Sequence, residues 1–180
     1  MSLLIMAEYQ YWEEKMGETE IAGTDIWYLV YFKTECYDQI CVSNSFVYPP
    51  RENAFSSFNF PGLYLLLDTT KKEVYVGESS DVKIRIKQHM DLDQAQKIVE
   101  FDRIALIWDG RPTVTSHLGN EALRKSLEKE CIRLWESYTK YEIANYVKGA
   151  KETNIRVESA TIRFTDELAF LFTKFFGHKD

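Results

Sequence analysis

The pattern of apolar and polar positions separates an aromatic N-terminal stretch from a tighter unit that begins at Pro61. Residues 7–17 carry large apolar side chains at helical spacing. Two dense apolar runs follow, at residues 25–32 and 40–48, and this pattern predicts a β-hairpin. The predicted strands would extend a sheet, cover its edge or form a dimer contact. The polar residues 51–59 mark the expected boundary.

After Pro61, short apolar runs alternate with helical patterns. Residues 62–67 form a continuous apolar run, which is typical of a buried strand, and residues 74–76 form its partner across a polar turn. Ser79, Ser80 or Asp81 can cap a helix that runs to about residue 90. The remaining expected elements are a helical piece over 91–100, a strand at 104–108, a long helix from about 118 to 135, a strand-like run at 155–164 and a helix at 165–176. This order predicts an α+β fold.

Composition supports a globular chain and disfavours several other classes. The chain has 180 residues, of which 45% are hydrophobic and 14% aromatic, as expected for a protein with a substantial core. No apolar run approaches the ~20 residues of a membrane span, and residues 2–6 are too short for a signal peptide, so we expect no membrane partner and a cytoplasmic location. The three cysteines, an odd number, do not suit a disulfide framework.

The net charge of −6 belongs to one end of the chain. Residues 1–60 carry 3 basic and 9 acidic side chains, whereas residues 61–180 carry 19 of each. Acidic surface repels nucleic acid, so we expect the N-terminal segment to lie away from any cleft that binds DNA. The remainder permits such a cleft without requiring it.

The first helix after the hairpin places polar side chains beside its apolar face. Val82, Ile86 and Met90 share the face that must pack on the sheet, and Arg85 and His89 border it one turn apart. A cation and an imidazole at such positions are costly unless they have partners. The structural interpretation is an arginine satisfied by a carboxylate or a carbonyl, with the histidine as a packing residue.

Two strand tyrosines and one helical glutamate complete the set of candidates. Tyr64 and Tyr75 lie in the middle of their strands and can meet on one face, although strand tyrosines are often only core residues. Glu128 lies inside the apolar arc of the long helix. Its carboxylate therefore either pairs with Arg124 one turn earlier or binds something else, such as a metal ion. Glu130 borders the same arc and is the competing candidate.

Together these residues resemble the GIY-YIG nuclease family. The matching positions are Gly62-Leu63-Tyr64, Tyr75-Val76-Gly77, Arg85, His89, Glu128 and Asn145. The hairpin spacing, with an arginine eight residues after the second glycine, is more specific than either tripeptide. The resemblance implies a small, mainly antiparallel three-stranded sheet flanked by helices over residues 61–147. Residues 1–60 are then an acidic helix and β-hairpin addition, and residues 148–180 a C-terminal helical extension that packs on the core.

The resemblance also implies an activity, the cleavage of DNA phosphodiester bonds with the help of one divalent ion. That ion would be Mg²⁺, and Mn²⁺ would be able to replace it. Tyr64 would orient or deprotonate the attacking water, and Tyr75 would support it or contact the phosphate. Arg85 would neutralise the non-bridging oxygens. His89 would position the phosphate or take up a proton, and it is the available acceptor for Tyr64, because a free tyrosine with a pKa near ~10 is a poor base.

Two further roles and one departure follow from the same resemblance. Glu128 would hold the metal ion beside the leaving 3′ oxygen, and Asn145 would stabilise the site. Repair incision nucleases of the family carry a lysine directly after the second glycine, and here that position is Glu78. This glutamate adds negative charge near the path of the phosphate.

The sequence therefore predicts a metal-dependent DNA endonuclease, with restriction or defence, repair and mobile-element roles all open. The alternative is a non-catalytic nucleic-acid-binding or scaffold domain that keeps the same fold. Residues 1–60 show no zinc-finger spacing and no helix-turn-helix pattern. Recognition of a target site would then come from loops, from the additions at both ends or from a homodimer.

Overall fold

The computed structural model of the chain describes residues 20–23, 27–37, 61–93, 99–109, 116–145 and 159–176. Its strands are β1 (Glu20–Gly23), β2 (Tyr28–Lys33), β3 (Gly62–Asp68), β4 (Glu73–Ser79), β5 (Arg103–Trp108) and β6 (Glu142–Ile143). Its helices are α2 (Val82–Met90), α3 (Glu121–Tyr138) and α4 (Ser159–Phe176), with short 3₁₀ turns η1 (Thr34–Cys36) and η4 (His117–Gly119).

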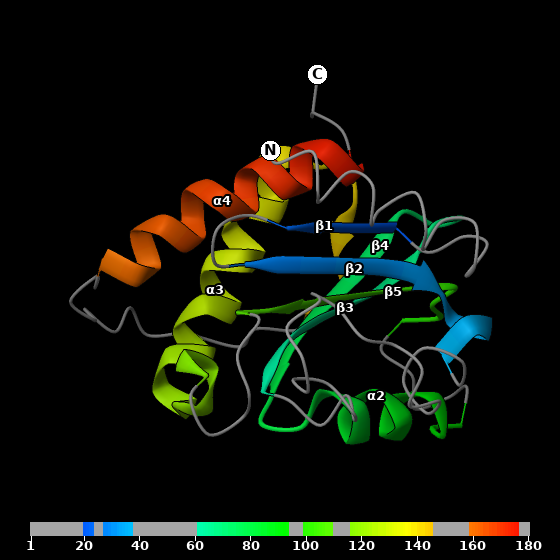
Figure 1. Cartoon of the computed structure of the whole chain (residues 1–180). Helices are drawn as coiled ribbons and strands as arrows, with labels where there is room; N and C mark the ends of the chain where they lie inside the picture. Colours follow the sequence, from blue (N-terminus) through cyan, green and yellow to red (C-terminus); the bar gives the residue numbers. More distant parts are fainter. Residues whose placement is uncertain are drawn as a thin grey trace.

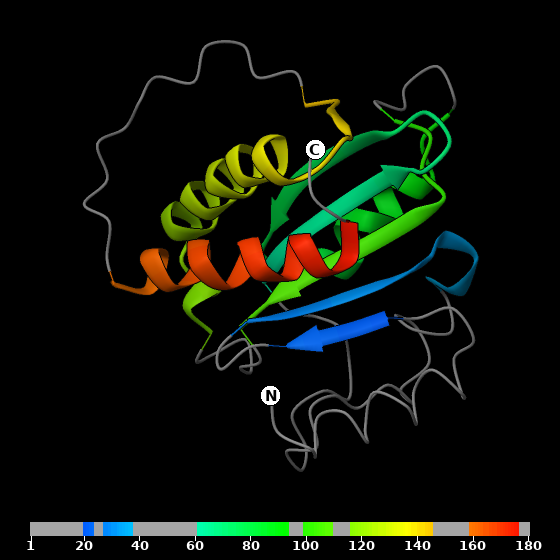
Figure 2. The same ribbon diagram turned by 90° about the horizontal axis from the view of Figure 1, so that it is seen from above.

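The strands form one sheet in the order β1-β2-β5-β3-β4-β6. Every pairing is antiparallel except that of β4 with β6. Helix α2 covers one face of the sheet, and α3 and α4 cover the other (Figures 1 and 2). The α+β prediction is confirmed, and the sheet of the described residues has six strands, more than the three that the resemblance implied for residues 61–147.

Strand β3 lies at the centre because it has no polar face. All its residues, Gly62–Asp68, are buried, as expected for a strand with helices on both sides. The hairpin to β4 is closed by the Asp68 carboxylate, which accepts hydrogen bonds from the backbone N–H groups of Thr70 and Lys71 at 2.9 and 2.8 Å. The strands expected at 62–67, 74–76 and 104–108 are all present.

The two helices around the hairpin begin at side-chain caps. The Asp81 carboxylate accepts from the Ile84 N–H at 3.1 Å, and α2 ends at Met90 as expected. The Asn120 side chain does the same for the Leu123 N–H, so α3 begins at Glu121 and the preceding residues form η4. The expected start of the long helix near residue 118 was therefore early by one 3₁₀ turn.

The extra strands come mainly from the N-terminal segment. Strand β2 pairs with β1 on one side and with β5 on the other, so this segment extends the sheet. Leu29, Val30 and Phe32 are fully buried, because β2 is covered on both faces. The predicted hairpin paired this strand with residues 40–48, which lie outside the described residues, as does the helix expected at 7–17. The hairpin partner seen here precedes β2 instead.

One C-terminal prediction was wrong. Residues 159–164 are part of α4 and not of a strand. Helix α4 buries Leu168, Leu171 and Phe172 completely, and it packs along α3. This tertiary packing outweighs the local preference of a β-branched run. No helix in the described ranges combines the length and the apolar character that a bilayer crossing requires.

Candidate active site

Gly77 allows the ring of Tyr64 to lie directly on the neighbouring strand. The two residues are partners in the β3–β4 register. A Cβ atom added to Gly77 would lie 2.3 Å from Cζ and 2.4 Å from Oη of Tyr64, far inside contact distance. Any side chain at position 77 would therefore displace the tyrosine. Close approach explains the glycine of the Tyr75-Val76-Gly77 tripeptide.

Three aromatic side chains meet on the α2 face of the sheet. Side chains alternate along a strand, so Tyr75 shares the face of Gly77 and therefore of Tyr64. The ring of His89 on α2 lies 5.6 Å from that of Tyr64 and 5.2 Å from that of Tyr75, measured between centroids. Tyr64 Oη and His89 Nε2 are 3.0 Å apart, within hydrogen-bonding distance.

Burial sets the protonation states of this pair. Burial, together with the neighbouring Tyr75, raises the pKa of Tyr64 above its ordinary value. Burial also lowers the pKa of His89, and the positive charge of Arg85 lowers it further. At neutral pH the tyrosine is protonated and the imidazole is neutral, so the Tyr64 hydroxyl donates to Nε2. The pair is a path along which a proton can move to the imidazole.

Arg85 provides an exposed cation beside these rings. Its Nη1 donates to Oε1 of Gln88 at 3.0 Å. Within the described residues it makes no salt bridge, so the structural interpretation in which a carboxylate satisfies this arginine is not what the structure shows. The guanidinium lies close enough to Tyr64 and His89 to influence both pKa values. Its remaining donors can bind an anion.

Asn145 anchors the strand that carries Tyr75 and Gly77. Its Oδ1 accepts from the Val76 N–H at 2.7 Å, and its Nδ2 donates to the Val76 carbonyl at 2.5 Å. These bonds continue the parallel pairing of β6 with β4, in which the Ala144 N–H donates to the Val74 carbonyl. The amide is thereby committed to the backbone of β4.

Glu128 on α3 is half-buried, and the cations of Lys125 and Lys129 only partly offset the charge of its carboxylate. It makes no hydrogen bond or ion pair with any other described residue. Burial raises the pKa of this carboxyl to about 6, and the nearby negative charge of Glu78 adds to the effect. Arg124 binds Glu78 instead, with Nε 2.7 Å from Oε2. Of the two sequence-based alternatives for Glu128, pairing with Arg124 is therefore wrong.

The competing carboxylate, Glu130, is already engaged. Arg133 donates to both of its oxygens, from Nε at 3.0 Å and from Nη2 at 2.5 Å. The Thr165 hydroxyl donates to Oε1 at 3.1 Å. Accordingly, the pKa of Glu130 is lowered, mainly by its hydrogen bond with Arg133.

The candidates surround β4 from two sides. Tyr64, Tyr75, Arg85 and His89 lie toward α2, whereas Glu78 alternates to the face toward α3. Glu128 has no described contact with the other five candidates. The side chain of Glu78 on β4 lies between the two groups, because it pairs with Arg124 on α3 and its charge acts on Glu128.

A carboxylate that pairs with no described residue and lies close to a second carboxylate suits a divalent cation. Magnesium usually binds one or two carboxylates, keeps several waters and takes further oxygens from substrate phosphates. Glu128 fits such a site as a single ligand. No group of three acidic, histidine or cysteine side chains with metal-binding geometry occurs among the described residues.

Some contacts near the site were not anticipated from the sequence. The Tyr37 hydroxyl, after β2, donates to the Lys83 carbonyl of α2 at 2.9 Å. The buried Asp109 carboxylate accepts from the Ser116 hydroxyl at 2.9 Å and from the His117 N–H at 2.8 Å, which closes the loop before α3. Both contacts join residues whose pairing has no local sequence signal.

Comparison with known proteins agrees with the geometry. No curated protein and no solved structure matches the chain. A family profile described as the GIY-YIG catalytic domain matches residues 60–176, well over half of the sequence. That range contains strands β3 to β6 and the three described helices, and with them every candidate residue described above. The chain therefore belongs to the GIY-YIG nuclease family.

Proposed function

We propose that this protein is a divalent-metal-dependent endonuclease that hydrolyses phosphodiester bonds in DNA. The observation that carries the proposal is the hydrogen bond between Tyr64 and His89, which lies over Gly77 and beside the exposed cation of Arg85. Perturbed titratable groups of this kind, a tyrosine–histidine pair beside an exposed guanidinium with no described salt bridge, cluster at active sites.

The tyrosine and the histidine act as a proton relay. A water molecule that attacks phosphorus must lose a proton, and Tyr64 Oη can accept it while the Tyr64 proton passes to His89 Nε2. The neutral imidazole ends as imidazolium, and the tyrosine ends unchanged. This path avoids a free tyrosinate, which the raised pKa of Tyr64 makes costly. Tyr75 packs against both rings and limits their movement.

Two groups serve to stabilise the negative charge that develops on the phosphate: the Arg85 guanidinium, and a metal ion that Glu128 would hold. The exposed guanidinium stabilises the non-bridging oxygens, because its donors are not neutralised by a described carboxylate. Glu128 would hold the metal ion, and when bound that ion supplies Lewis-acid stabilisation of the leaving oxygen. Asn145 keeps β4 in place under these groups through its bonds to Val76.

The proposal is tested by cleavage of supercoiled, linear, branched and single-stranded DNA with Mg²⁺ or Mn²⁺, against EDTA and a Glu128→Ala variant. Metal-dependent cutting that the variant loses supports the nuclease with Glu128 as ligand. The preferred substrate would distinguish restriction from repair. Absence of cutting on every substrate, together with absence of metal binding, would refute the proposal in favour of a non-catalytic domain.

A further inference from the structure

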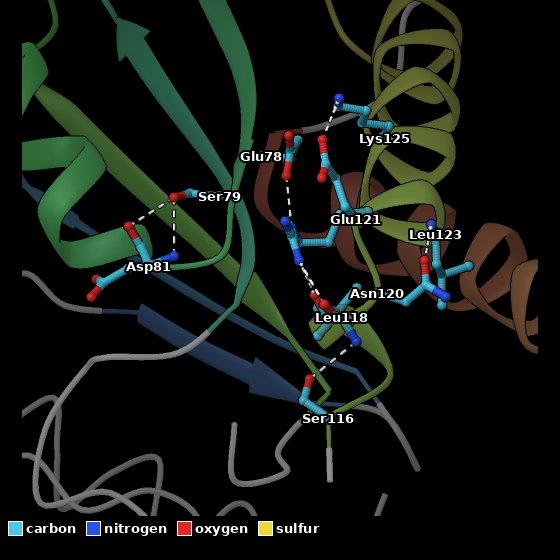
Figure 3. Close-up of polar contacts among 11 residues, drawn as sticks. Glu78, Ser79, Asp81, Ser116, Leu118, Asn120, Glu121, Leu123 and Lys125 are labelled. Atoms are coloured by element: carbon cyan, nitrogen blue, oxygen red, sulfur yellow. Dashed lines mark hydrogen bonds and ion pairs between the residues drawn. The ribbon is translucent and has the colours of Figure 1, made fainter. Parts of the chain in front are cut away.

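Arg124 and Glu128 are placed to attract each other, yet they do not pair. They lie four residues apart on α3, at the spacing where opposite charges on a helix interact. The Arg124 guanidinium instead binds Glu78, with Nε 2.7 Å from Oε2. Figure 3 shows Glu78 reaching from β4 toward the first turns of α3. The carboxylate of Glu128 is left without an ion pair among the residues described.

The Arg124 side chain is buried, so its charge needs a partner within the protein. Only 6% of this side chain is exposed, against 17% for Glu78. Nη1 of Arg124 donates to the carbonyls of Leu118 at 2.7 Å and Gly119 at 3.1 Å, which fixes the guanidinium at the start of α3. A buried guanidinium without a carboxylate would be strongly destabilising. If Glu78 were absent, two carboxylates would lie about one turn from Arg124 on α3: Glu121, which already pairs with Lys125, and Glu128, which has no described ion pair.

We propose that Glu78 is a positioning residue that holds the Arg124 guanidinium away from Glu128 and so keeps the Glu128 carboxylate free to bind a divalent cation. This inference rests on the proposed function, because it assumes that Glu128 is a metal ligand. It deepens that function by assigning a role to the carboxylate that directly follows Gly77.

The charge balance of the three side chains makes the inference measurable. Glu78, Arg124 and Glu128 together carry one net negative charge. A Glu78→Gln variant carries none and leaves Arg124 free to pair with Glu128. A Glu78→Gln/Arg124→Met double variant restores the single negative charge and removes the competitor. Glu78→Gln leaves the Arg124 guanidinium a carboxylate partner in Glu128, and the double variant leaves Glu128 in its wild-type state and removes the buried guanidinium, so both are expected to fold.

The experiment measures Mn²⁺ affinity by isothermal titration calorimetry without DNA. We expect Glu78→Gln to weaken binding about tenfold or more, because a charge-assisted hydrogen bond from Arg124 then occupies the ligand. The double variant should bind within about twofold of the wild type, since its net charge at the site is unchanged. The matched control is Arg133→Met, which breaks the exposed pair with Glu130 on the same helix and should leave the affinity unchanged. Wild-type affinity in Glu78→Gln, or failure of the second substitution to restore it, would overturn the inference.

DNA cleavage gives a second readout that a damaged fold would not reproduce. Cutting by Glu78→Gln should fall at low Mn²⁺ and recover at saturating Mn²⁺, because the defect lies in competition for Glu128. A lower rate that persists at saturation would contradict the role assigned to Glu78.

A metal-free measurement separates failure of this inference from failure of the proposed function. Urea unfolding of the single and double variants at Arg124 and Glu128 gives a double-mutant cycle, run in the wild-type and Glu78→Gln backgrounds. The midpoint shifts should add in the wild type and be non-additive once Glu78 is removed. Additivity in both backgrounds would refute the exchange of partners. A wild type that neither binds Mn²⁺ nor cuts DNA would refute the proposed function, whatever the cycle shows.

Discussion

Replacing Glu128 with glutamine should stabilise the protein while abolishing its activity. The folded structure keeps this carboxyl half-buried and close to Glu78, so its pKa is raised from 4.5 to about 6. A raised folded-state pKa means that the folded protein binds the proton more tightly than the unfolded chain. The favourable contribution of this group is therefore fully present below pH 4.5 and is lost as the pH rises through about 6.

The size of the effect follows from the same shift. A rise from 4.5 to about 6 corresponds to about 2 kcal/mol of unfolding free energy above pH 7. Because the carboxyl keeps some contact with water, screening reduces this to about 1 kcal/mol. Glutamine has a similar shape and no charge, so Glu128→Gln should recover that amount, or about 2–4 °C in melting temperature for a chain of this size.

The assay is urea unfolding of metal-free protein from pH 4 to pH 8. The advantage of Glu128→Gln should be present at pH 7.5 and should vanish near pH 4.5. Added Mg²⁺ at ten times its Kd should stabilise the wild type by about 1.4 kcal/mol and leave the variant unchanged. The matched control is Glu130→Gln, which should lose stability at neutral pH, because the pKa of Glu130 is lowered by Arg133. A variant less stable than the wild type at pH 7.5 would refute the reasoning.

Three other predictions follow from contacts in the site. Gly77→Ala should cost about 1–3 kcal/mol of stability and nearly all activity, because its Cβ would overlap the Tyr64 ring. Wild-type cleavage by this variant would contradict the requirement for Tyr64 to lie against position 77. The relay needs a neutral imidazole, and the pKa of His89 is lowered. At saturating metal, the rate of cleavage should therefore decline only when the pH falls below the usual histidine range. His89→Ala should cut about 100-fold more slowly or worse and lose that acidic limb, and a pH–rate profile unchanged by the substitution would rule the relay out. Asn145→Ala should destabilise the protein by about 1–3 kcal/mol, because it removes both bonds to Val76, and thermal unfolding of the variant against the wild type checks this.

Local patterns were enough to predict the hairpin of β3 and β4 and the helix that follows it. Strand length, the polar turn and the Asp81 cap all act within a few residues of one another. The same is true of α2, where spacing along the helix placed His89 at the border of the apolar face. The pairing of His89 with Tyr64 was expected from the family resemblance, and the two side chains meet at 3.0 Å.

Features that depend on competition between distant partners were not accessible in this way. Residues 25–32 had a strand pattern, but nothing local decided that β2 would pair with β1 and β5. The run at 155–164 showed strand character, yet its described part is helical because α4 buries its apolar face against α3. Such outcomes depend on burial summed over many residues.

The sequence by itself determined the identity and spacing of the candidate residues, and with them the family. Only the tertiary structure decided how their charges are shared. The sequence allowed Arg124 to pair with Glu78 or with Glu128. Because β4 packs against α3, Arg124 forms its ion pair with Glu78. The Asn145 amide likewise found the Val76 backbone only because β6 lies beside β4. The physical reason is that a helix or strand pattern specifies which face a side chain occupies, whereas its partner is chosen by the element that packs there.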